Sequence, residues 1–107
     1  MIIFVTNWFV MEIVFADKRL KDAYEKPGEL ERLFGPRKAE LIRIRIQTLK
    51  AVDNMNQLWS FPGHFHPLRE DRAGEWACNL DHVYRLIFKY IPDNKALIVD
   101  IVNYHGK

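Results

Sequence analysis

Apolar positions near the start of the chain form one short run and then take helical spacing. Residues 13–15 are β-branched or aromatic, which predicts a short buried strand. Asp17 is a typical N-cap residue, and residues 18–26 carry apolar side chains on one helical face until Pro27-Gly28 ends the pattern. We therefore predict a strand followed at once by a helix over residues 18–26.

Two more helical stretches are predicted before residue 53. The first contains Leu30 and Phe34 and ends at Gly35-Pro36, where Pro36 suits the first turn of a helix that we extend to about Val52. Residues 42–46 alternate like a strand, but the segment is long for a strand and has no internal breaker. We predict a helix, because the apolar positions also fit a helical stripe: Ala39, Ile42, Ile46 and Leu49.

From residue 64 onward the pattern changes to β-like runs separated by turn signals. The runs cover 64–68, 75–80, 83–90 and 96–104, and the turns cover 71–74, 81–82 and 92–95. In the third run, alternation gives one face to the core and leaves the other able to present Arg85. The short connections favour antiparallel hairpins.

Together these elements predict an α+β fold. An N-terminal strand and two to three helices are expected to pack on one face of an antiparallel sheet of four to five strands. With 107 residues and no internal repeat or linker, the chain is expected to form a single domain over residues 1–107.

Composition narrows the class of protein without naming a function. The one cysteine, Cys78, excludes an intrachain disulfide and is interpreted as a small buried hydrophobic residue. A net charge of +2 permits an anionic partner without demanding one. Residues 1–16 lack a basic start and a cleavage motif and are too short to span a bilayer, so we expect a cytoplasmic protein with no membrane partner.

Three motifs together resemble the HigB-like toxins, which are often described as plasmid maintenance killer proteins, within the RelE/ParE superfamily. They are the run Phe65 to Trp76 (FHPLREDRAGEW), the strand Tyr84 to Phe88 (YRLIF), and Ile101 to Gly106 (IVNYHG). The opening FADKRL, residues 15–20, is also typical. A YRLIF-like strand occurs across the superfamily, whereas the ordered set of three motifs is fairly specific. The resemblance as a whole extends from about Met11 to the C-terminus.

The resemblance implies a RelE-like fold of β-α-α-β-β-β-β order and a toxin that cuts messenger RNA on the ribosome without a cofactor. It also implies an antitoxin encoded beside the toxin, of the HigA-like kind that carries a helix-turn-helix. Transferred residue by residue, the active-site positions are His66, Arg69, Arg72, Arg85, Tyr104 and His105. Asn103 departs from the pattern, since many relatives have an acidic residue there, and an amide can orient a histidine but cannot serve as a base.

These residue types suit RNA cleavage because RNA carries its own nucleophile, the 2′-hydroxyl group. The protein must align that hydroxyl, move two protons and stabilise charge on the phosphate, and a metal ion is not needed for any of these steps. His66 and His105 are candidates for the two proton transfers, although the sequence does not say which is the acid. The arginines match phosphate oxygens, and Tyr104 can bond a phosphate or stack on a base.

The long helix predicted over 36–52 is rich in cations. We expect it to contact RNA by a salt-dependent interaction, or to accept an acidic antitoxin segment on the same surface. The alternative interpretation of such a helix face is ordinary solvated charge. The predicted RNA-contacting residues are Arg37, Lys38, Arg43, Arg45, Lys50 and Asn103.

Two other functions remain open. ParE-like relatives share the fold but act by binding DNA gyrase, which needs no paired proton-transfer groups; an inactive relative kept for antitoxin binding is favoured by Asn103. A metal site is a third possibility, since His64 and His66 are two residues apart. No cysteine or carboxylate nearby completes a recognisable ligand set with His82 or His105, so we expect no metal.

We predict that residues 1–10 are an extension that the fold does not need, since Met11 opens a complete first strand and is an alternative start. Deletion of residues 1–10 is expected to leave a cooperative thermal unfolding transition, measured by circular dichroism. A shortened chain that melted without a cooperative transition would contradict this interpretation.

Overall fold

The computed structural model describes residues 11–81 and 83–103. Residues 1–10, His82, Tyr104 and His105 lie outside the described residues, so the predictions made for them are not addressed by the structure. The helices and strands are β1 (Glu12–Phe15), α1 (Lys18–Glu25), α2 (Glu29–Ala51), η2 (Met55–Ser60), β2 (His66–Pro67), η3 (Glu70–Arg72), β3 (Trp76–Asn79), β4 (Tyr84–Ile91) and β5 (Lys95–Asn103).

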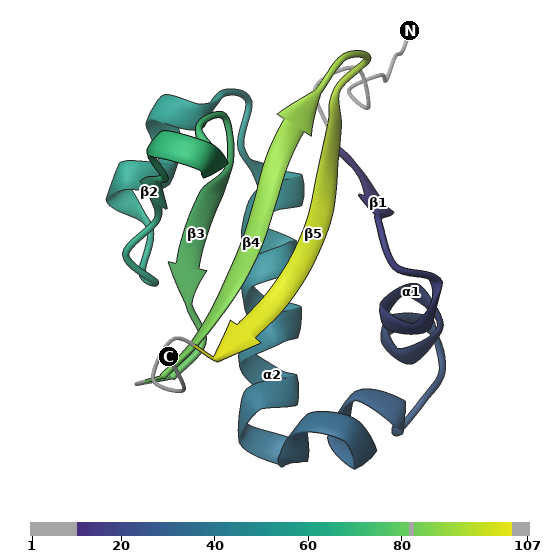
Figure 1. The fold of residues 1–107 in the computed structure, drawn as a ribbon. Coiled ribbons are helices and arrows are strands. Elements are labelled where there is room, and N and C mark those ends of the chain that lie inside the picture. Colours follow the sequence, from purple (N-terminus) through teal and green to yellow (C-terminus); the bar gives the residue numbers. More distant parts are fainter. Residues whose placement is uncertain (1–10, 82, 104–107) are drawn as a thin grey trace, which may run out of the picture.

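The strands form one sheet in the order β1-β5-β4-β3-β2. Strands β2 to β5 are antiparallel neighbours, as the short connections predicted, and β1 joins the other edge by pairing parallel to β5. Figure 1 shows α2 lying across one face of this sheet and α1 beside β1. The predicted α+β architecture, with its helices on one face of a sheet of four to five strands, is confirmed. The prediction that the sheet is antiparallel is wrong for β1, which pairs parallel to β5.

The helix α2 contains the two predicted stretches, joined at Gly35. This glycine has φ 84° and ψ 159°, which interrupts the helix directly before Pro36. Positive φ is accessible to glycine without steric cost, so the chain changes direction where the sequence predicted a break. The ambiguous segment 42–46 is helical, and its stripe is buried: Ala39, Ile42, Ile46 and Leu49 are all at most 1% exposed.

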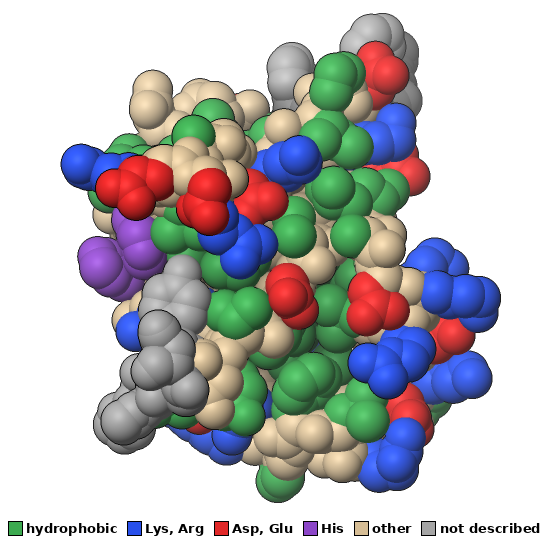
Figure 2. Space-filling view, in the orientation of Figure 1, with side chains coloured by type: hydrophobic (Ala, Val, Ile, Leu, Met, Phe, Trp, Pro, Cys, Tyr) green, Lys and Arg blue, Asp and Glu red, His purple; other side chains and the backbone are tan. Residues whose placement is uncertain are grey.

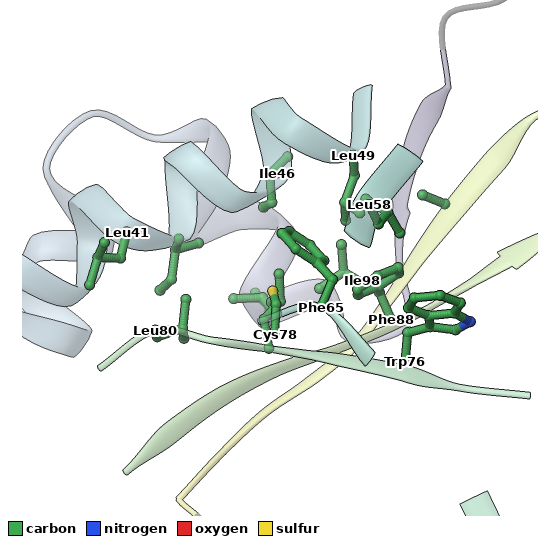
Figure 3. Packing of buried hydrophobic residues seen from close by; sticks show 14 of the residues in the cluster. Leu41, Ile46, Leu49, Leu58, Phe65, Trp76, Cys78, Leu80, Phe88 and Ile98 are labelled. Atoms are coloured by element: carbon green, nitrogen blue, oxygen red, sulfur yellow. The ribbon is translucent and has the colours of Figure 1, made fainter. Parts of the chain in front are cut away.

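The core lies between α2 and the sheet. Figure 3 shows Ile46 and Leu49 of α2 above Phe88 of β4, with Phe65 and Leu58 filling the space between helix and strands. Cys78 of β3 belongs to the same cluster, and burial raises the pKa of its thiol to about 12. The thiol therefore stays protonated at neutral pH. Its complete burial confirms Cys78 as a buried hydrophobic residue.

The region before β3 differs most from the prediction. The strand predicted over 64–68 is reduced to the two residues of β2, and it begins late because His64 has a left-handed backbone conformation, with φ 52°. Glu70, in the turn after β2, is also left-handed, with φ 59°. A 3-10 helix over Met55–Ser60 was not predicted at all. Phe65, which follows this helix, is buried, whereas Trp59 is 59% exposed and Phe61 is 38% exposed.

No helix within residues 11–81 and 83–103 is long and apolar enough to cross a membrane.

Replacement of Phe65 by alanine is expected to lower the free energy of unfolding by about 3–5 kcal/mol, because a fully buried aromatic ring leaves a cavity. Phe61→Ala is the matched control, since Phe61 is partly exposed four residues earlier, and we expect a change of about 0.5 kcal/mol or less. Urea unfolding of both variants measures the difference. Equal losses would show that Phe65 does not fasten β2 to the core.

Candidate active site

His66 and Arg85 project from the same face of the sheet. In the register of the ladder, His66 pairs with Ala77, and Ala77 pairs with Ile87, two residues from Arg85. Side chains at paired positions share a face, and alternate residues of a strand do so too. We call this the outer face, because the residues of β3 and β4 that belong to the core cluster under α2 point the other way: Trp76, Cys78, Leu86 and Phe88. Ala77 and Ile87, on the outer face, are also buried.

Figure 2 views the outer face and shows the histidine side chains at one edge, with acidic and basic side chains nearby. The strand spacing of about 4.8 Å places β2 and β4 roughly 10 Å apart, with β3 between them. His66 and Arg85 are both half-buried. A phosphodiester lying across β3 could therefore be reached by both side chains.

His64 determines which nitrogen of His66 carries a proton. The Nδ1 atom of His66 lies 2.8 Å from the backbone carbonyl oxygen of His64. A carbonyl oxygen can only accept a hydrogen bond, so Nδ1 is the protonated nitrogen and the neutral ring leaves Nε2 as an acceptor. The two imidazole rings also stack, with centroids 4.6 Å apart. The pair is thus preorganised to take up a proton at one defined atom.

Arg69 and Arg72 lie in the turn that follows β2. The 3-10 helix η3 is closed by hydrogen bonds from the Arg72 amide to the Arg69 carbonyl and from the Ala73 amide to the Glu70 carbonyl. Arg69 is exposed at the start of this turn. Arg72 forms an ion pair with Glu75, with Nε 2.6 Å from the carboxylate oxygen. The Glu75 carboxylate therefore competes with a phosphate group for Arg72.

Arg85 is held by the hairpin that precedes it. Its Nη1 donates to the carbonyl oxygens of Asp81, at 3.2 Å, and Tyr84, at 3.1 Å. The Asp81 carboxylate in turn accepts from the amides of Val83 and Tyr84 and pairs with Lys38 of α2 at 3.4 Å. Burial raises the pKa of Asp81, but the two amides and Lys38 outweigh it, so its pKa lies below the usual value.

The cations of α2 do not form one face. Lys38 and Arg45 point to the end of the sheet where β3 connects to β4. There Lys38 also lies over the Tyr84 ring. Arg45 donates a hydrogen bond to the Asn79 carbonyl oxygen. Arg43 pairs instead with Glu31 of the same helix. Arg37 makes a long pair with exposed Glu40, at 3.8 Å, and Lys50 lies in the last turn.

Asn103, predicted beside the catalytic residues, faces the other way. It pairs with Tyr84, whereas its neighbour Val102 pairs with Arg85. Asn103 therefore lies on the side of β5 that faces the helices, at the end of the strand.

Two further features of the surface bear on the site. A hollow of about 550 Å³ lies between α1, the start of α2 and β5, and its described lining comes from those elements and from the residues beside them rather than from β2 or η3. In the part of the chain that the structure describes, no group of three or more histidine, cysteine or acidic side chains is placed to hold a metal ion.

The family model for HigB-like toxins, described as RelE-like toxins of the type II toxin-antitoxin system HigB, matches residues 13–105. The chain belongs to this family. It is thus the toxin of a type II toxin–antitoxin system, and the class of its partner is an antitoxin. The match begins one residue after the start of β1 and contains every position proposed above for catalysis.

Solved structures share the fold of this HigB-like toxin at low sequence identity. A YoeB/ParE toxin from Agrobacterium tumefaciens superposes with a TM-score of 0.64 at 19% identity, covering 87% of this chain and 98% of that one. The YoeB-YefM complex from Staphylococcus aureus gives 0.63 at 17% identity, covering 89% and 97%. YafQ from E. coli gives 0.55 at 12%, covering 90% and 96%. No curated protein matches the chain.

Sequence reasoning missed two positions that organise the site. His64 was considered only as a metal ligand, although its carbonyl orients His66. Asp81 was assigned only to a turn, although it caps the hairpin that carries Arg85. The signal for the second was available, because an aspartate two or three residues before a strand is a common acceptor for turn amides.

Asp81→Asn is expected to lower the free energy of unfolding at pH 7 by about 1 kcal/mol or less, because the amide keeps the turn acceptor and loses the charge. The lowered pKa of Asp81 stabilises the fold above the carboxyl's ordinary range, and that gain is lost as the pH falls through the folded pKa. The difference from wild type should therefore shrink below about pH 4.

Urea unfolding at a series of pH values measures this difference, with exposed Asp53→Asn as the control. A gap between Asp81→Asn and wild type that stayed constant down to pH 3 would show that the charge of Asp81 does not stabilise the hairpin.

Proposed function

We propose that this HigB-like toxin is a metal-independent endoribonuclease that cleaves messenger RNA on the ribosome. The observation that carries the proposal is the His64–His66 hydrogen bond, which leaves Nε2 of His66 as the acceptor atom of its ring, on the outer face. A toxin that acts by contact alone, such as a gyrase-binding relative, has no use for a proton acceptor held in one tautomer. The family assignment also supports the proposal, although it gives the class of toxin and not the reaction.

His66 is proposed as the general base. Its Nε2 takes the proton of the RNA 2′-hydroxyl as that oxygen bonds to the adjacent phosphorus. The bond from phosphorus to the 5′-oxygen then breaks, and the leaving oxygen receives a proton from an acid, for which we propose His105. The products are a 2′,3′-cyclic phosphate and a 5′-hydroxyl end. Proton transfer by one such group typically contributes about 10²–10⁴-fold to the rate.

Guanidinium groups are proposed to stabilise the charge that develops on the phosphate. Arg85 is the strongest candidate, because two carbonyls fix its Nη1 on the face that presents His66. Arg69 is exposed one turn from β2 and would contact the neighbouring phosphate. Arg72 would have to exchange its Glu75 partner for RNA, which assigns it a smaller part. Tyr104 is proposed to bond a phosphate or stack on a base.

The antitoxin is proposed to be HigA-like, with a helix-turn-helix, as the family resemblance implies. The YoeB-YefM complex from Staphylococcus aureus provides a precedent for a protein of this fold in complex with a second component. The Arg37–Glu40 contact is long and both side chains are exposed, so we propose the start of the predicted basic helix, around Arg37, for RNA or for an acidic antitoxin segment.

Expression from a tightly controlled promoter, followed by mapping of transcript 5′ ends, tests the proposal. Wild type should stop growth and create new 5′-hydroxyl ends in translated messages. His66→Asn should reduce cleavage about 10²–10⁴-fold, because an amide nitrogen can keep the bond to the His64 carbonyl but cannot act as the base. His82→Asn is the matched control, as the same substitution at a histidine without a proposed role.

Growth arrest without new transcript ends would reject the nuclease and favour a toxin that acts by binding, with gyrase inhibition as the assay. Undiminished cleavage by a folded His66→Asn variant would reject the proposed base while leaving the nuclease in place.

A further inference from the structure

Two consecutive residues with positive φ form the turn that leads into β2. Gly63 has φ 119° and His64 has φ 52°. The second value is uncommon for a residue with a side chain and is energetically unfavourable, so the surrounding structure must hold the turn in place. One part of that support is visible in the backbone, since the carbonyl of Gly63 accepts from the Asn79 amide at 2.7 Å.

Arg45 of α2 supports the same turn from the helix side. Its Nε donates to the carbonyl of Asn79 at 2.8 Å, so Asn79 is bonded through its amide to Gly63 and through its carbonyl to Arg45. The Arg45 side chain also lies directly against Gly63. A Cβ atom at position 63 would lie 2.6 Å from Nε of Arg45, which means that the arginine has room only because residue 63 is glycine.

These contacts lead, one after another, from Arg45 to the imidazole of His66. The turn held by Arg45 and Asn79 fixes the direction of the His64 carbonyl, and that carbonyl receives the hydrogen bond from Nδ1 of His66. A shift of about 1 Å in such a support can cost about 10²-fold in rate, because proton transfer depends closely on geometry.

We infer that Arg45 is a positioning residue for His66, a role that rests on the ribonuclease function proposed above. By holding the Gly63–His64 turn, Arg45 keeps the proton of neutral His66 on Nδ1, so that Nε2 faces the RNA 2′-hydroxyl. This role replaces the direct RNA contact predicted for Arg45 from the sequence. The two roles differ in what they require of the side chain: a phosphate contact requires charge, whereas positioning requires the Nε donor and the planar guanidinium over Gly63.

Nitrogen-15 NMR of histidine-labelled protein tests the structural part without any activity. Spectra are recorded at a pH where the ring is neutral, because the two neutral tautomers have distinct ring-nitrogen shifts. The His66 signals are assigned with the His66→Asn variant. Wild type should carry the proton on Nδ1, and Arg45→Met should populate the Nε2–H tautomer. Arg32→Met is the matched control, since Arg32 lies in the same helix and pairs with Glu29 of that helix.

Cleavage kinetics on ribosome-bound message test the catalytic part. We expect Arg45→Met and Arg45→Lys each to lower kcat about 10²-fold while KM changes less than twofold. Lysine keeps the charge but lacks the Nε donor, so a contact made by charge would survive in Arg45→Lys. Gly63→Ala disturbs the same turn without changing any charge, because a side chain is strained at φ 119° and its Cβ would also meet the arginine. The cooperative melting of every variant is verified first.

The outcomes separate the two proposals. A wild-type His66 protonated on Nε2, or an unchanged tautomer in folded Arg45→Met, would overturn the positioning role. Normal kcat in Arg45→Lys, together with a raised KM and a weaker salt dependence in Arg45→Met, would restore the RNA contact. If wild type cleaves no RNA but His66 behaves as expected in the spectra, the ribonuclease function fails and the orientation of His66 by Arg45 stands.

Discussion

Phe65 fastens the edge of the sheet to the core, and the candidate site depends on this attachment. Its side chain is 1% exposed, and its ring meets Phe88 of β4 edge to face, with centroids 6.0 Å apart. Strand β2 contributes only two paired residues, too few to remain in place by backbone hydrogen bonds alone. Because neighbours in extended backbone point to opposite faces, the inward ring at position 65 sends His66 outward.

Much of the basic character of the chain is used to hold its own elements together. Lys38 joins α2 to the β3–β4 hairpin, Arg43 joins the two parts of α2 across the kink, and Arg45 joins α2 to the end of β3. A positively charged helix in a small toxin is therefore weak grounds for assigning an RNA surface, and the charge on the strands is more informative.

Regular elements of this fold follow from local pattern, which is why they could be predicted. The stripe through Ile42 and Ile46 and the break at Gly35 depend only on neighbours within a few residues. The two motifs that carry His66 and Arg85 likewise identified side chains that share a face. The turn at His64 could not be predicted, because its support comes from Arg45 and Asn79, which are distant in sequence and carry no periodic signal.

Pairing between β1 and β5 has a consequence for how the toxin is made. Glu12 lies beside Lys95, so the first strand finds its place only after nearly the whole chain has left the ribosome. Closing a loop of that length is entropically costly, and sheets built on such distant partners assemble slowly. The sheet is thus completed late. While most of the chain is being synthesised, the nascent polypeptide lacks β5, the strand that lies between β1 and β4.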